Sequence, residues 1–170
     1  MMIKEKNINN PFINLVNYKM MAAKEAQYAE QFADMKNEPK RLEYFLSLRG
    51  INFIDDTKAQ SINAIWYSLE SMHCPVTLIA KDIDDLQELL KLKQLLMLKV
   101  KGIVFLTPKR KYIKLLRPMV GAIHFSKTMD EAVSWAYKNT ESDDAVLFCA
   151  GVKVDVDKES RIFQEAVRKL

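Results

Sequence analysis

The stretch VTLIAKDIDDLQELLKLKQLLMLKVKGIVFL, residues 76–106, decides the fold class. It opens with a short apolar run at Val76–Ala80 and closes with a second one at Gly102–Leu106. Between them, Asp84–Leu98 is rich in leucine, begins with acidic residues and is followed by lysines, the charge order that a helix dipole favours. Two short apolar strands joined by a helix predict a parallel sheet that is covered on both faces.

The same alternation continues on both sides of this unit. Upstream, two strand-like runs flank Arg49-Gly50 and predict an antiparallel hairpin. The expected strands are 42–48, 51–54, 76–80, 102–106, 120–125 and 145–149, and the expected helices are 12–36, 56 or 57 to 69, 84–98, 109–116, one that opens at 127–131, and 157–169. Asp56 or Thr57 is the expected cap of the second helix, and Thr128 with Glu131 matches a capping box.

These elements predict an α/β fold: a Rossmann-like, doubly wound, mostly parallel sheet with an antiparallel hairpin at one edge. Pro39 ends the first helix, because the residue before a proline avoids the helical region. We therefore expect an N-terminal helical extension over residues 1–38 and the α/β domain over residues 39–170.

Composition excludes several functional classes. The 170 residues contain four glycines, at positions 50, 102, 121 and 151, so neither a G-x-x-x-x-G-K-[ST] loop nor a G-x-G-x-x-G fingerprint is present. No stretch is long and apolar enough to cross a membrane, and the first residues lack the apolar core of a signal peptide. We expect a cytoplasmic protein without membrane association.

Cysteine and histidine are too sparse for a metal centre. Cys74, Cys149, His73 and His124 are the only residues of these two types, which predicts neither a disulfide framework nor a zinc site. His73 and Cys74 are adjacent, but neighbouring side chains on an extended strand point to opposite faces. We expect inert thiols and no metal.

Positive charge is concentrated in one segment. Residues 89–129 contain no acidic residue but ten basic ones: Lys91, Lys93, Lys99, Lys101, Lys109, Arg110, Lys111, Lys114, Arg117 and Lys127. Such a segment can attract anionic partners, including nucleic acid. Because aromatic residues are not interleaved with the charges, we favour a solvated lysine surface and consider nucleic acid unlikely as a partner.

The leucine-rich helix also predicts an association surface. On a continuous helical wheel, Leu95 and Leu98 fall among charged residues. The face that packs on the sheet is shared by Leu86, Leu89, Leu90, Leu96, Met97 and Val100. Exposed leucines on this helix favour a homodimer or a complex with a protein partner.

Loops at the carboxyl ends of parallel strands are the expected place for a ligand. The loop after residue 54 contains Asp55-Asp56-Thr57-Lys58, a dense polar set. The loop after residue 149, Ala150-Gly151-Val152-Lys153, contains no serine or histidine. The first of these loops is the candidate site.

The sequence around this loop resembles a known family. Lys40-Arg41-Leu42-Glu43 is followed by Ile51-Asn52-Phe53-Ile54-Asp55-Asp56-Thr57-Lys58-Ala59. These motifs are similar to the H-R-L-E and N-D-S-K-A-T-N motifs of the Mur ligase C-terminal domain, in the branch that adds D-glutamate to UDP-N-acetylmuramoyl-alanine. The resemblance spans roughly residues 38–170 and implies a role in peptidoglycan synthesis.

What the resemblance implies is a domain that presents an amino acid to a separate ATPase domain. Carried over by motif, Arg41, Asp56 and Lys58 are the expected nucleotide-binding residues, and no residue is expected to be catalytic. ATP and magnesium are implied only if a separate ATPase domain completes the enzyme, so we expect no cofactor for this chain. The alternative for the three residues is an ion-pair cluster at the surface that caps a helix.

Departures from the family pattern decide the expected function. The glycine-rich loop whose lysine grips the amino-acid carboxylate has no counterpart in residues 80–84, and a serine-bearing loop is replaced by Cys149-Ala150-Gly151-Val152-Lys153. We expect a stand-alone, catalytically inactive relative that binds a protein or a small anionic ligand. The alternatives are a detached domain that completes a D-glutamate ligase on another chain and a basic module that binds nucleic acid or another polyanion.

Overall fold

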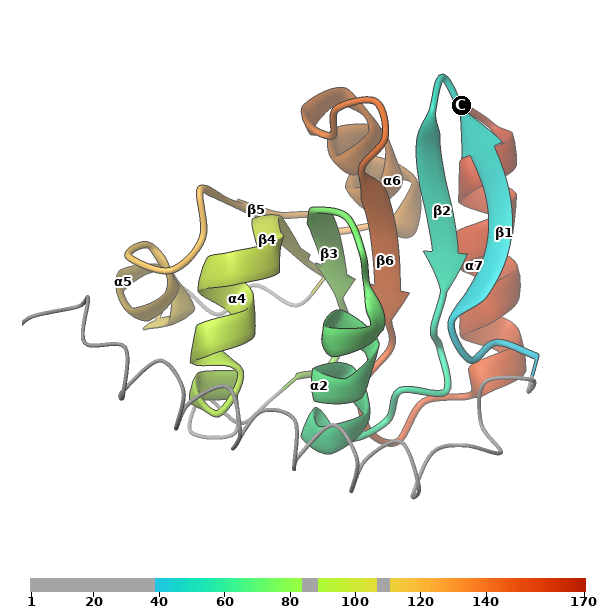
Figure 1. The fold of residues 1–170 in the computed structure, drawn as a ribbon. Coiled ribbons are helices and arrows are strands. Elements are labelled where there is room, and N and C mark those ends of the chain that lie inside the picture. Colours follow the sequence, from blue (N-terminus) through green and yellow to red (C-terminus); the bar gives the residue numbers. More distant parts are fainter. Residues whose placement is uncertain (1–38, 84–88, 107–110) are drawn as a thin grey trace, which may run out of the picture. The chain divides into compact units, whose positions relative to one another are not determined.

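A computed structural model describes residues 39–83, 89–106 and 111–170 (Figure 1). The extension expected over residues 1–38, with its helix at 12–36, lies outside the described residues. The strands are β1 (Glu43–Leu48), β2 (Ile51–Asp55), β3 (Val76–Ala80), β4 (Val100–Phe105), β5 (Ala122–Phe125) and β6 (Ala145–Cys149). The helices are α2 (Ile62–Ser71), α4 (Lys93–Lys99), α5 (Lys111–Leu116), α6 (Met129–Asn139) and α7 (Val156–Arg168).

The strands form one mixed sheet in the order β1-β2-β6-β3-β4-β5. β1 pairs with β2 in an antiparallel hairpin at one edge, and the other four pairings are parallel. The chain runs outward from β3 to β4 and β5 and then returns through α6 to place β6 between β2 and β3. The predicted Rossmann-like, mostly parallel sheet with an antiparallel hairpin at one edge is confirmed.

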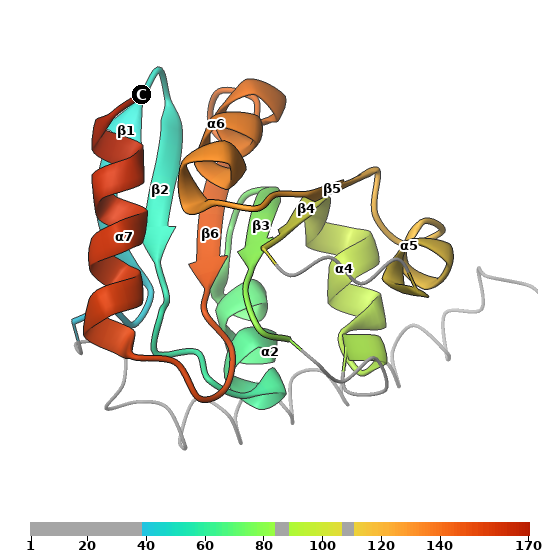
Figure 2. The same ribbon diagram turned by 180° about the vertical axis from the view of Figure 1, so that it is seen from behind.

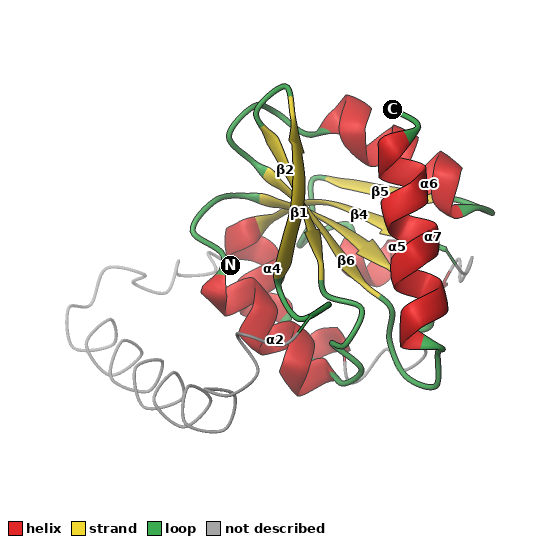
Figure 3. Ribbon diagram, turned by 90° about the vertical axis from the view of Figure 1, so that its right-hand side faces the viewer, coloured by secondary structure: helices red, strands yellow, loops and turns green. Residues whose placement is uncertain are grey.

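Helices cover both faces of the sheet (Figures 2 and 3). Side chains of α2, α4 and α5 pack with one face around Leu78, Ile103 and Leu147, and those of α6 and α7 pack with the other face around Ile79, Val104 and Phe148. Strands β3 and β6 are buried along their whole length, as expected for central parallel strands. Their bounds agree with those predicted from the apolar runs.

The helix after the hairpin begins later than predicted, and its cap is a different residue. Ser61 caps α2, and its hydroxyl accepts a hydrogen bond from the Ala64 N–H at 3.1 Å. The side chains of Asp56 and Thr57 are buried in polar contacts of their own, so neither is available as a cap. At α6 the Thr128 hydroxyl accepts from the Glu131 N–H at 3.2 Å, as predicted.

The predicted helical wheel for residues 84–98 is wrong at Leu95 and Met97. The chain forms a turn at residues 91–92, and α4 starts afresh at Lys93, so the helix is not continuous through this point. The break changes the rotational phase: Leu95 is buried in the core, whereas Met97 is 57% exposed. Leu98 is 71% exposed, as expected.

No helix in the described part of the chain is both long enough and apolar enough to span a membrane.

Candidate functional site

Polar side chains gather at the carboxyl ends of β2, β3 and β6, where the arrowheads of these strands point in Figure 1. Asp55 and Asp56 lie at the end of β2, Lys81 follows β3, and Gly151 lies in the loop after β6. Because adjacent residues of a strand face opposite sides of the sheet, the two aspartates belong to two separate clusters. One cluster faces α2, and the other faces α7.

On the α2 side, Asp56 forms a buried ion pair with Arg41, and neither side chain is exposed to solvent. The Asp56 carboxylate also accepts from the Leu42 N–H at 3.0 Å and from the Ser68 hydroxyl. The Arg41 guanidinium donates to the Ser68 hydroxyl at 2.8 Å and to the Ala64 carbonyl at 3.1 Å. The hairpin and α2 are therefore fastened together by one buried network.

Electrostatics in this network are set by burial. Loss of hydration raises the pKa of the Asp56 carboxyl, while the Arg41 guanidinium, the Ser68 hydroxyl and the Leu42 N–H oppose that rise. Lys40 and Leu42, on either side of Arg41, have positive φ angles of 64° and 48°, which side chains rarely adopt. The hydrogen bond from the Leu42 N–H to Asp56 holds this strained turn in place.

On the α7 side, the buried Asp55 carboxylate accepts hydrogen bonds from neutral donors. One carboxylate oxygen accepts from the Thr57 N–H at 3.1 Å and from the Thr57 hydroxyl. The second carboxylate oxygen accepts from the Ser160 hydroxyl at 2.5 Å and from the Gln164 amide at 3.1 Å. Four donors thus occupy its acceptor positions and join β2 to α7.

The loops after β3 and β6 are held together by an ion pair and by a close backbone contact at Gly151, which we call the loop clasp. The Lys81 ammonium pairs with Glu159 at 2.6 Å, and the Glu159 side chain is only 8% exposed. Gly151 has a φ of +76°, and a Cβ at this position would lie 2.4 Å from the Lys81 carbonyl oxygen and 2.8 Å from that of Asp82. Only glycine allows this approach between the two loops.

The three site residues predicted from the resemblance, Arg41, Asp56 and Lys58, occupy two different environments. The structure brings Arg41 and Asp56 together, although as a buried pair and not as the surface ion-pair cluster considered above. Lys58 lies nearby with a half-buried side chain, and its N–H donates to the Lys40 carbonyl at 3.1 Å. The Lys40 ammonium in turn pairs with Asp157, and this contact raises the pKa of Lys40 and lowers that of Asp157.

Four residues of the two clusters and the loop clasp were not predicted from the sequence: Ser68, Glu159, Ser160 and Gln164. Each is a polar residue on the buried side of a helix. Ser160 and Gln164 are four residues apart on the face of α7 that also carries Phe163 and Val167. This spacing, with polar side chains inside an apolar stripe, was the available signal.

Nucleotide and magnesium do not fit the buried pair. Arg41 and Asp56 are buried and bonded to each other, and the acceptor positions of Asp55 are taken by neutral donors. In the described ranges, no three His, Cys, Asp or Glu side chains are grouped so that they could hold a metal ion. Of the three predicted site residues, Arg41 and Asp56 are buried and Lys58 is half-buried.

A hollow of about 310 Å³ lies on the α2 side of the hairpin. It is lined by Leu42, Tyr44, Asn52, Ile54, Ser71, Met72, His73, Cys74 and Ala145. His73 and Cys74 lie in a bend after α2, and not on an extended strand as predicted from the sequence. Both residues therefore line the same hollow. Burial raises the pKa of Cys74, and Asp144 adds to the effect, so this thiol is not activated as a nucleophile.

Comparison with curated proteins finds similar sequences among D-glutamate ligases. The chain is 33% identical over 159 residues to the UDP-N-acetylmuramoylalanine–D-glutamate ligase of Porphyromonas gingivalis, covering 91% of this chain and 35% of the ligase. It is 32% identical over 130 residues to the same enzyme of Cytophaga hutchinsonii, covering 74% and 29%. The chain therefore spans about a third of the length of these relatives. No defined family profile matches it.

Solved structures with the same fold come from related enzymes. The UDP-N-acetylmuramate–alanine ligase of Thermotoga maritima superimposes with a TM-score of 0.53 at 16% identity, covering 83% of this chain and 36% of that one. A single domain assigned to a UDP-N-acetylmuramate:L-alanyl-γ-D-glutamyl-meso-diaminopimelate ligase of Haemophilus ducreyi gives a TM-score of 0.53 at 14% identity, covering 75% of this chain and 99% of that domain. At these identities the likeness concerns the fold.

Proposed function

Because the chain is related to the C-terminal domain of the Mur ligases, we propose that it is a non-catalytic relative of that domain. In this proposal it acts by binding a protein or a small anionic ligand. The observation that carries the proposal is the internal pairing of the charged groups at the strand ends. Arg41 pairs with Asp56, and Lys81 pairs with Glu159.

The ion pair between Lys81 and Glu159 affects whether this domain can bind an amino acid. In the family pattern, a lysine on a glycine-rich loop after this strand grips the carboxylate of the incoming amino acid. Here the Lys81 ammonium is 2.6 Å from a nearly buried carboxylate. Binding a substrate carboxylate would require breaking this ion pair and leaving Glu159 without its cation, which is costly for a buried charge.

A second candidate function is supported by the 33% identity to D-glutamate ligases. The chain would then be a detached domain that completes such a ligase on another polypeptide. This function requires the Lys81–Glu159 pair to open when the other chain docks. The two candidate functions are distinguished by adding the chain to a D-glutamate ligase that lacks its C-terminal third. Only a domain that completes the ligase would restore amide formation.

Calorimetric titration with ATP, a UDP-linked precursor and D-glutamate tests ligand binding. We expect weak heat from the two phosphate-containing ligands, with a Kd of about 0.1–1 mM, and none from D-glutamate. Lys58→Ala should reduce this heat, because Lys58 is the cation of this loop whose side chain is half-buried and not fully buried. Lys138→Ala, an exposed lysine on α6, is the matched control. Heat from D-glutamate would contradict the proposal that the Lys81–Glu159 ion pair prevents binding of an amino-acid carboxylate.

A further inference from the structure

Three consecutive residues with soft metal donors line the hollow beside the hairpin. Met72, His73 and Cys74 carry a thioether, an imidazole and a thiol, and all three border its volume of about 310 Å³. On a straight strand the middle residue would face away from the other two. Here the chain bends at residues 73–74, directly after α2. The bend therefore brings three donor groups to one space.

The donors are close enough to reach a single ion. The Cα atoms of Met72 and Cys74 are at most about 7 Å apart, because the two residues are two positions apart in the chain. A metal–sulfur bond is about 2.3 Å long, so both sulfurs can reach the same ion. Met72 is 8% exposed, Cys74 is half-buried and His73 is exposed. The set therefore has a buried floor and is open to solvent at the imidazole.

The backbone of the bend is fixed on both sides. The Met72 N–H donates to the Leu69 carbonyl at 3.2 Å, and the Met72 carbonyl accepts from the Lys99 ammonium at 3.0 Å. After the bend, the Pro75 carbonyl accepts from the Ala145 N–H at 3.0 Å. A donor set that is held in place in this way loses little conformational freedom when it binds.

We infer that Met72, His73 and Cys74 form a binding site for Cu(I). Thiolate and thioether sulfurs are the ligands that select this soft ion, and imidazole also binds copper. The inference does not depend on the proposed function, because neither Lys58 nor Lys81 lines the hollow.

Zinc fits this set less well. Structural zinc sites use four cysteine, histidine or carboxylate ligands, and no three His, Cys, Asp or Glu side chains in the described ranges are grouped for such a site. The sequence was expected to bind no metal because it lacks a four-ligand zinc set. That reason does not apply to Cu(I), which accepts fewer ligands and binds the sulfur of methionine.

Binding exchanges a proton for the metal ion. The S–H bond of Cys74 breaks, a sulfur–copper bond forms and the proton passes to solvent, while copper remains Cu(I). Burial raises the pKa of this thiol, so the proton leaves when the ion arrives and not before. The copper thiolate has no net charge. It therefore avoids the cost of burying an ion and is not repelled by the Lys99 ammonium.

A competition titration tests the site, with the full chain and the Cu(I) chelator bicinchoninate under nitrogen. We expect one Cu(I) per chain and a loss of affinity of at least about tenfold in each of Met72→Leu, His73→Ala and Cys74→Ser. The reason is that loss of a group that only supports a metal ligand already costs about ten- to a hundredfold in affinity.

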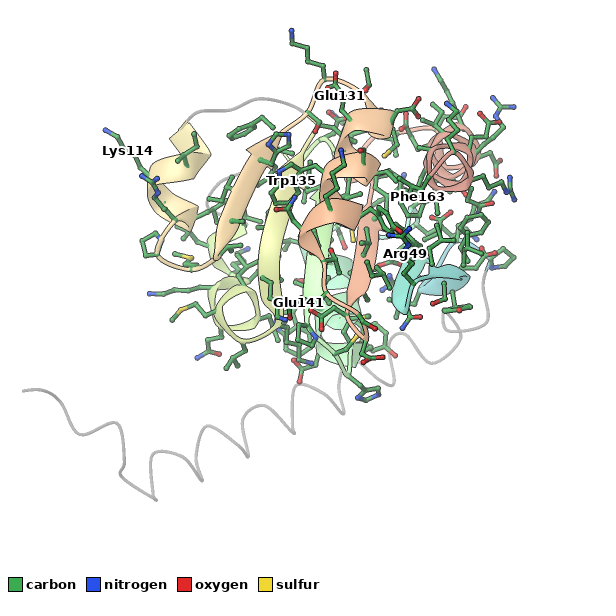
Figure 4. All side chains as sticks on the ribbon, turned by 90° about the horizontal axis from the view of Figure 1, so that it is seen from above. Arg49, Lys114, Glu131, Trp135, Glu141 and Phe163 are labelled. Atoms are coloured by element: carbon green, nitrogen blue, oxygen red, sulfur yellow. The ribbon has the colours of Figure 1, made fainter. Side chains whose placement is uncertain are left out.

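Each ligand has a matched control of the same residue type in the described part of the chain. Cys149 is buried in the core, Met97 is 57% exposed on α4, and the ring of His124 stacks on Trp135 of α6 (Figure 4), with the ring centroids 5.0 Å apart. None of these residues lines the hollow. Cys149→Ala, Met97→Leu and His124→Ala should therefore leave the Cu(I) affinity unchanged, and circular dichroism checks that each variant is folded.

Three results would overturn the inference. The first is a failure of the chain to take Cu(I) from bicinchoninate. The second is an affinity that falls as much in Cys149→Ala as in Cys74→Ser. The third is an affinity that is unchanged in both Met72→Leu and His73→Ala, which would show adventitious binding to a thiol. Because His73 is exposed, His73→Ala should retain the fold and keeps the test decisive if a sulfur variant is unstable.

Discussion

Replacing Arg41 by Met is expected to lower the free energy of unfolding by about 3–5 kcal/mol. The change leaves the Asp56 carboxylate buried without its cation and removes the donors to Ser68 and Ala64. A loss of this size is a large fraction of the 5–15 kcal/mol that holds a typical domain folded. Urea denaturation followed by circular dichroism measures it directly.

The double variant Arg41→Met with Asp56→Leu tests whether the unpaired Asp56 carboxylate causes the loss of stability. Removing both charges eliminates the buried unpaired ion, so the double variant should be more stable than Arg41→Met alone. Arg161→Met, on the exposed side of α7, should change stability by no more than about 0.5 kcal/mol. If Arg41→Met costs no more than Arg161→Met, the pair does not fasten the hairpin to α2.

Gly151→Ala is expected to cost about 3 kcal/mol or more, from a left-handed backbone combined with contact between the new Cβ and backbone carbonyls. Those carbonyls belong to Lys81 and Asp82 and cannot rotate away, since they are part of the loop itself. The change should also weaken the clasp, seen as faster hydrogen exchange at the Lys81 N–H, which donates to the Cys149 carbonyl at 3.1 Å.

Gly50 provides a matched control with the same backbone conformation. Its φ is +79°, but the nearest atom to an added Cβ is the Ser142 hydroxyl oxygen, at the end of a side chain that can rotate. Gly50→Ala should therefore cost about 1–2 kcal/mol, the backbone penalty alone. Equal losses for the two alanine variants would show that the loop clasp does not depend on the close approach at Gly151.

The two central strands were predictable because each is a short apolar run between residues that end a strand: Pro75 and Lys81 flank the first, and Asp144 and Ala150-Gly151 flank the second. Val76–Ala80 and Ala145–Cys149 have the same limits in sequence and structure. The phase of the leucine-rich helix was not predictable in this way, because a turn at residues 91–92 interrupts the helix and changes the direction in which Leu95 and Met97 face. Leu95 and Met97 exchanged their expected environments for this reason.

The candidate site was only partly predictable. The polar loop at residues 55–58 and the motif positions Arg41 and Asp56 were visible in the sequence. Their burial was not, since it depends on Ser68 of α2 and on the folding of the hairpin against that helix. The pairing of Lys81 with Glu159 joins residues 78 positions apart and left no local signal.

Phosphate release measures whether this chain catalyses ligation. The purified chain is incubated with ATP, magnesium, the UDP-linked precursor and D-glutamate. We expect no phosphate above the protein-free control, because the 170 residues contain no phosphate-binding loop and because Arg41 and Lys81 are paired with Asp56 and Glu159. Phosphate release that follows the chain through purification and disappears in Lys58→Ala, a change that leaves the buried pair intact, would contradict this expectation.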